Sequence, residues 1–238
     1  MPAHITLRAE KDAAIESGYP DANRGNHPTM WVGRYSRNSL YRDLIRFDLS
    51  DMSCCVNITS AILNLYVSEA TAPGVCAYVA PYRVIRKWPE DQVTWNTAPA
   101  YDAAALCTAV SLDDTGWYQW DVTKIVSDWF NGIYPNCGLL LMSTEAADRE
   151  TKRFIASENT HTELRPCLKI TYSRREDVMD PEQPSDEVIE PVTDTAPQPE
   201  ADISEPDTNT TPEPETNTTP EPEADAAPQP EAGETDPE

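Results

Sequence analysis

Apolar and polar residues alternate with a period of two along much of the first 174 residues. In the stretch 41–49, Ile45, Phe47 and Leu49 fall on one side, while Arg46 and Asp48 fall on the other. The stretch 61–67 repeats the pattern, with an inward set of Ala61, Leu63, Leu65 and Val67. Such alternation is typical of half-buried β-strands, whose successive side chains point to opposite faces of a sheet.

Six further stretches show a similar strand pattern: 30–35, 75–87, 117–122, 138–142, 153–156 and 167–172. Turn-forming Gly, Pro, Asp and Asn residues separate the strands, at 18–21, 23–26, 72–74 and 113–116. Many short strands with this punctuation predict an all-β antiparallel sandwich or barrel.

The stretch 123–132 breaks the strand pattern. Its apolar residues Ile125, Val126, Trp129 and Phe130 recur at helical spacing. Thr123 is a suitable N-cap, and Gly132 is a suitable stop signal. We therefore expect one short helix, packed on the edge of the sandwich.

Residues 175–238 have the composition of a chain that does not fold. From Glu176 onward there are 21 acidic residues, 13 of the 22 prolines, no Lys or Arg and no aromatic residue. Short repeats occur here too, since 208–215 recurs as 216–223. So little apolar surface cannot offset the entropy of ordering the backbone, and alternating Pro and Glu favours an extended chain. We predict one domain at 1–174 and a disordered acidic Pro/Glu/Thr-rich tail at 175–238.

The charge distribution argues against nucleic acid as a partner. Before Glu176 there are 20 acidic and 18 basic residues, so the domain is nearly neutral, and the tail would repel phosphate. No apolar run approaches the roughly 18 residues of a membrane-spanning helix. The N-terminal residues show no signal-peptide pattern.

The cysteines fall into two groups. Cys76, Cys137 and Cys167 lie in or beside apolar strand-like stretches, which predicts buried thiols. The adjacent pair Cys54 and Cys55 lies in a polar turn and is poorly explained by packing. Cross-linking between chains, giving self-association, is one role for this pair and soft-metal binding is another, but no CxxC or Cys/His cluster supports a zinc site.

A series of segments then carries a family resemblance. It begins with Asp12-Ala13-Ala14-Ile15, 20–25 and 31–35, and continues through 44–50, 60–66, 84–88 and 93–99. It runs on through 121–123 with Trp129, 136–139, 154–158 and 165–172. No single segment is specific, but their order resembles DNRLRE domains, also classed as carbohydrate-binding module family 96. The resemblance spans the domain and none of the tail.

The resemblance implies a jelly-roll-like β-sandwich in secreted or cell-surface proteins of bacteria and archaea. Such modules are often attached to polysaccharide-degrading enzymes, and members with an assigned ligand bind acidic polysaccharide such as alginate. This chain departs from the pattern in having cysteines at core positions and in showing neither a leader nor an enzyme domain.

No catalytic motif is found, and the chain is not expected to be an enzyme. The acidic pairs Glu90-Asp91 and Asp113-Asp114 lie in turns, where solvated side chains are the ordinary explanation. No cofactor is predicted, because a structural calcium in the Asp21/Asn23 loop has no ligand-spaced motif to support it.

The tryptophans raise the question of sugar stacking. Trp88, Trp95 and Trp129 lie among other apolar residues, which favours a place in the core. Trp31 and Trp117 lie next to loop segments, and both interpretations stay open for them.

Four arginines near the N-terminal loops form the best candidate site. Guanidinium groups match uronate carboxylates bidentately, and tyrosine rings can carry a sugar face. The predicted carbohydrate-binding residues are Arg24, Arg34, Tyr35, Arg37, Tyr41 and Arg42, called the arginine edge below. The alternative is that these arginines solvate an exposed strand or pair with Asp21 and Asp43.

Two functions follow from these patterns. The first is a non-catalytic module that binds acidic polysaccharide, outside the cell or at its surface. The second is a structural surface or spore-envelope protein, in which Cys54 and Cys55 cross-link neighbours and the acidic tail forms a hydrophilic layer.

Overall fold

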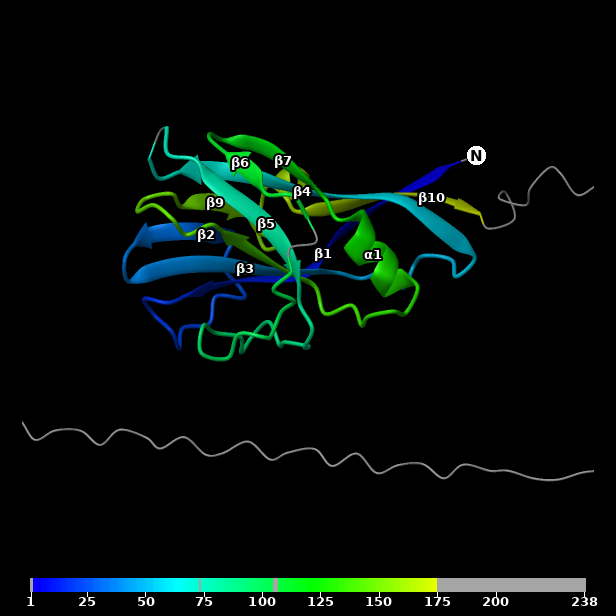
Figure 1. Ribbon diagram of the computed structural model, residues 1–238, viewed down its shortest axis with the longest axis horizontal. Helices are drawn as coiled ribbons and strands as arrows, with labels where there is room; N and C mark the ends of the chain where they lie inside the picture. Colours follow the sequence, from blue (N-terminus) through cyan, green and yellow to red (C-terminus); the bar gives the residue numbers. More distant parts are fainter. Residues whose placement is uncertain (1, 73, 105–106, 175–238) are drawn as a thin grey trace, which may run out of the picture. The chain divides into compact units, whose positions relative to one another are not determined.

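The computed structural model describes residues 2–72, 74–104 and 107–174, which form an antiparallel β-sandwich with one short α-helix (Figure 1). The all-β prediction is therefore confirmed. The last described residue, Arg174, ends β10, and the predicted tail lies outside the described residues. The strands are β1 (Ala3–Glu16), β2 (Thr29–Ser36), β3 (Ser39–Phe47), β4 (Val56–Ala70), β5 (Ala77–Arg83), β6 (Val110–Leu112), β7 (Gly116–Asp121), β8 (Leu139–Ser143), β9 (Lys152–Ile155) and β10 (Cys167–Arg174).

Two strands belong to both sheets of the sandwich. In β1, residues 3–8 pair with β10 and residues 9–16 pair with β3. In β2, residues 29–32 pair with β9 and residues 33–36 pair with β3. The first sheet continues from β10 to β4, which pairs with both β7 and β9, and the second continues from β3 through β8 and β5 to β6. β1 and β2 therefore connect the two sheets, because each of them pairs with strands of both.

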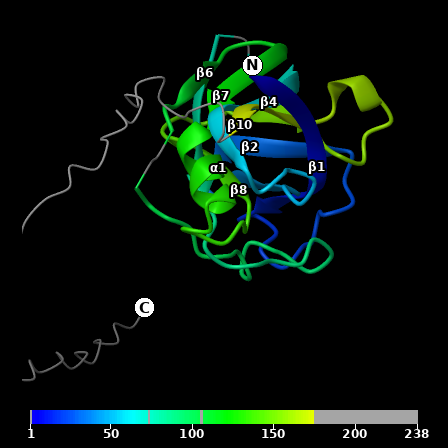
Figure 2. The ribbon, with the colours of Figure 1, turned by 90° about the vertical axis from the view of Figure 1, so that its right-hand side faces the viewer.

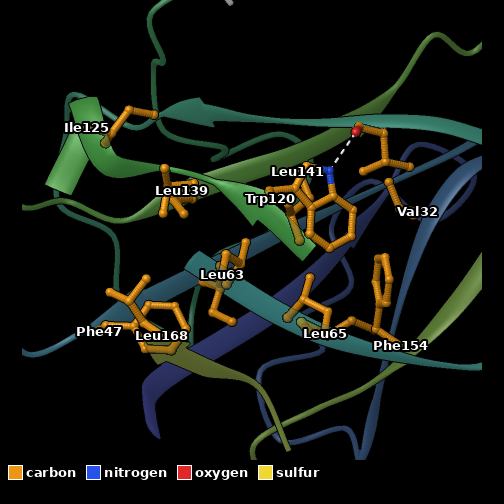
Figure 3. Close-up of a cluster of buried hydrophobic side chains, with 14 of the residues drawn as sticks. Val32, Phe47, Leu63, Leu65, Trp120, Ile125, Leu139, Leu141, Phe154 and Leu168 are labelled. Carbon is orange, nitrogen blue, oxygen red and sulfur yellow. Dashed lines mark hydrogen bonds between the residues drawn. The ribbon is translucent and has the colours of Figure 1, made fainter. Parts of the chain in front are cut away.

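The main core lies between the sheets and follows the predicted alternation. The inward residues of β4 are fully buried, as are Ile45 and Phe47 of β3. Leu49 lies beyond the end of β3 and packs partly buried against the core. Trp120 of β7 packs edge-on to Phe154 and donates its indole N–H to the Val79 carbonyl at 2.8 Å (Figure 3).

A second, smaller core covers the outer face of β3 and β8. Leu44 and Leu140 meet Trp88 and Val93, which belong to the segment 84–101 that follows β5. The indole N–H of Trp88 donates to the Cys137 carbonyl at 3.0 Å, so this buried ring is held in place. The strand predicted at 75–87 therefore ends early, at Arg83, because the chain turns there to cover the sheet.

The predicted helix is α1 (Thr123–Phe130), whose Ile125, Val126 and Trp129 join the main core. It lies at one end of the sandwich, and Figure 2 shows it on the side opposite β1. Gly132, at φ +71°, follows its C-terminus as expected. The described residues include no helix that is long and apolar enough to cross a membrane.

Thr123 was predicted as the N-cap of α1, and this is wrong. The N-cap is Val122, which has no side-chain cap, and Thr123 is the first helical residue. The hydroxyl of Thr123 instead accepts the backbone N–H of Ala61 at 2.9 Å. The carboxylate of Asp121 accepts the N–H of Thr123 at 2.9 Å, so an aspartate side chain satisfies the first backbone donor of the helix.

Candidate functional site

The β2–β3 hairpin carries five of the six residues of the arginine edge. Gly33 pairs with Tyr41 and Ser36 pairs with Ser39, which leaves Arg37 at the exposed tip. Arg42 follows Tyr41 along β3, and its cross-strand partner on β1 is Ile15. Arg24 comes from the loop before β2, so the structure brings residues from two segments toward one end of the sandwich.

Arg34 and Arg42 converge on Glu145, in the loop between β8 and β9. The guanidinium of Arg42 donates to both carboxylate oxygens of Glu145, at 2.8 and 3.2 Å, and lies over the ring of Trp95. Arg34 donates to the Glu145 carbonyl at 3.3 Å and forms an ion pair with Asp148 at 2.8 Å. Two members of the edge thus share one acidic loop.

Arg24 and Tyr41 share a different carboxylate, that of Glu16 at the end of β1. Arg24 pairs with it at 2.6 Å, and the Tyr41 hydroxyl donates to it at 2.8 Å. The Tyr41 hydroxyl is protonated at neutral pH, as tyrosine normally is, and burial raises its pKa further. The buried Glu16 therefore fixes both side chains.

The alternative prediction that these arginines pair with Asp21 and Asp43 is wrong. Asp21 accepts a hydrogen bond from the side chain of Asn96 at 2.8 Å. Asp43 is fully buried on the inward face of β3 and forms no ion pair within the described residues. Arg24 instead pairs with Glu16, which lies only eight residues away on β1. Arg34 and Arg42 pair with Asp148 and Glu145 of the β8–β9 loop, which lie far away in sequence.

Tyr35, Arg37 and Arg149 are open to solvent in this region. Tyr35 is 51% exposed, and Arg37 has no ion-pair partner among the described residues. The backbone N–H of the exposed Arg149 donates to the Tyr35 carbonyl at 3.1 Å. No local pattern in the sequence marks Arg149, because only the pairing of β2 with the chain before β9 brings it here.

Some of the tryptophans lie in the cores, and others are partly exposed. Trp88 and Trp129 are buried and Trp95 packs against the second core, which confirms the structural interpretation. Trp31 is half-buried, with the guanidinium of Arg153 over its ring and the ring of Tyr41 6.0 Å away. Trp117 is 45% exposed on β7 and packs edge-on to Tyr66 of β4, so it offers an aromatic face away from the arginine edge.

The cysteine predictions hold in part. Cys137 and Cys167 are buried, whereas Cys76 is only half-buried. Cys54 and Cys55 are both exposed, with their Sγ atoms 3.5 Å apart.

The loop of Asp21 and Asn23, for which no ligand-spaced calcium motif is found, has a structural role. The side-chain amide of Asn23 donates to the carbonyls of Glu90 and Val93, at 2.7 and 2.8 Å, and so holds the covering segment onto the loop. The expectation that Glu90 is solvated is wrong, since its half-buried carboxylate accepts the Asp12 N–H at 2.9 Å. Within the described ranges, no three His, Cys, Asp or Glu side chains gather as a metal-binding group.

Comparison with known proteins shows the family of this chain. A search of curated proteins finds no match. The model of carbohydrate-binding module family 96 matches residues 3–172, from the first strand to the last. The match covers well over half of the chain, and the chain therefore belongs to carbohydrate-binding module family 96.

Proposed function

We propose that this chain is a non-catalytic carbohydrate-binding module for acidic, uronate-containing polysaccharide, working at the cell surface or after secretion. The arginine edge is its contact surface in this proposal. The observation that carries it is the exposed ring of Tyr35, with Arg37 on the same hairpin and Arg149 hydrogen-bonded to its backbone.

The charge of this surface supports an anionic ligand. Arg24, Arg34 and Arg42 are balanced by Glu16, Asp148 and Glu145, which leaves the charges of Arg37 and Arg149 in excess. The partner of Arg34, Asp148, is itself 59% exposed, so a uronate carboxylate can replace it at little cost. Guanidinium forks bind carboxylates bidentately, and the Tyr35 ring can stack on a sugar face.

The proposal is tested by native electrophoresis of the full chain through gels that contain alginate. We expect retention that weakens with added salt, since exposed charges are screened. Arg34→Ala with Arg37→Ala removes two charge-assisted contacts and is expected to weaken binding about tenfold or more. The control, Lys169→Ala with Arg174→Ala, changes the net charge equally at exposed positions of β10. Equal retention of the two double variants would overturn the assignment of the arginine edge.

The exposure of Cys54 and Cys55 favours a second candidate, a cysteine-cross-linked structural surface or spore-envelope protein. Native material would then run as covalent multimers on non-reducing gels and as monomer after reduction. Monomer under both conditions would remove this candidate.

A further inference from the structure

Two aspartates project into the sandwich from neighbouring strands. Asp43 of β3 lies opposite Ala14 of β1, so Asp12 and Asp43 lie diagonally across the same face. Ala14 and Ile45, their neighbours on this face, belong to the main core. The relative exposure is 1% for Asp12 and 0% for Asp43, which places both carboxylates out of reach of bulk water.

Asp43 lacks the partners that a buried carboxylate needs. Neither of its carboxylate oxygens has a hydrogen-bond partner, and the backbone N–H of Trp31 faces it without a bond of normal geometry. Asp12 accepts one hydrogen bond, from the Ser157 N–H at 2.8 Å. Buried charges are normally paired or bound to metals, and each unsatisfied buried group calls for an explanation.

The charged groups around the two aspartates make the site more negative. Glu158, after β9, and Glu90, in the covering segment, both raise the pKa of Asp12. The cation Lys11 donates to the Trp88 carbonyl at 2.5 Å and lies over the Trp88 ring. It only partly opposes the rise in the pKa of Glu90 that burial causes. Among the described residues, no Lys or Arg forms an ion pair with Asp12 or Asp43. A negative site inside the fold therefore lacks a protein cation to balance it.

We infer that Asp12 and Asp43 bind one calcium ion inside the sandwich, with Glu90 and Glu158 adding negative potential outside it. Two carboxylates balance the charge of a divalent ion, and the oxygens of Asp43 are free to bind it. Calcium fits better than zinc because the donors are oxygens, and better than magnesium because calcium accepts irregular shells. Main-chain oxygens and water would complete the shell, so three acidic side chains are not needed.

The test uses the full chain after removal of metal with a chelating resin, at pH 7.5. We expect calorimetry with calcium chloride to show one site, and the Tm to rise by about 5 °C or more at calcium well above its Kd. Asp43→Asn should abolish both signals. Asp48→Asn, the same change at an exposed position just beyond β3, should leave them intact.

Three results would overturn the inference. They are no heat and no Tm shift of the wild type with calcium, an equal response to magnesium, and calcium binding retained in Asp43→Asn. In the first case the two aspartates are protonated groups without a ligand. Because calorimetry on the wild type decides the question directly, a variant that fails to fold does not prevent a decision. Glycan binding is a separate readout, and this inference does not depend on it.

Discussion

At the scale of single residues, buried carboxylates dominate the electrostatics of the domain. Burial, together with the nearby Glu158 and Glu90, raises the pKa of Asp12 to about 8. Burial, followed by the charge of Asp12, raises the pKa of Asp43 well above its usual value. An isolated buried carboxylate responds to such surroundings by holding its proton.

This predicts how stability depends on pH in metal-free protein. The folded state holds protons that the unfolded state loses above its pKa of about 4, so the free energy of unfolding falls as pH rises from about 4 to about 8. The slope is at most about 1.4 kcal/mol per pH unit for each group. Urea unfolding at pH 5, 6.5 and 8 measures it. Asp43→Asn should flatten the profile, and a wild-type stability that rises across this window would contradict the account.

At the scale of elements, two glycines after α1 allow a direct comparison of backbone constraints. Gly132 and Gly138 both have positive φ, of +71° and +92°. A Cβ on Gly138 would lie 2.5 Å from the Ile45 carbonyl oxygen, whereas a Cβ on Gly132 would meet no atom within 4 Å. Gly138 thus allows the chain entering β8 to pass close to β3.

Gly132→Ala should cost about 1–2 kcal/mol, from the left-handed backbone alone. Gly138→Ala should cost at least about twice as much, because the backbone it meets cannot yield without moving β3. Chemical denaturation of both variants measures the difference. Equal costs would mean that the close approach at Gly138 is easily relieved.

The alternation of apolar residues predicted most of these elements, because each strand with one buried and one open face shows it directly. It did not mark β1 as a strand by period, since residues 12–16 are buried on both faces and include Asp12 and Glu16. It also did not show which carboxylates would meet the arginines. Glu145 and Asp148 lie more than a hundred residues from Arg34 and Arg42, and only the pairing of β2 with β9 brings them together.

At the scale of the whole molecule, the predicted tail and the sandwich are expected to be energetically independent. Deleting residues 176–238 should shift the Tm by no more than about 1 °C, because a segment so poor in apolar residues has little surface to bury. Differential scanning calorimetry of the full and shortened chains provides the comparison. A large drop in Tm would show that the tail packs on the domain.

The groups exposed on the domain also determine how strongly it is expected to bind a ligand. Two excess arginine charges and one exposed tyrosine ring predict weak contacts that add along a polyanionic chain. The exposed Trp117 on β7 is the competing surface, and it would favour sugar stacking without a preference for charge.

The most direct test of the central claim is a glycan array that presents uronate polymers and neutral polymers of matched length to the full chain. The account predicts binding to the uronate polymers that falls as salt is raised, with little binding to the neutral ones. A clean blank on every uronate polymer, or equal binding to neutral polymers, would contradict it.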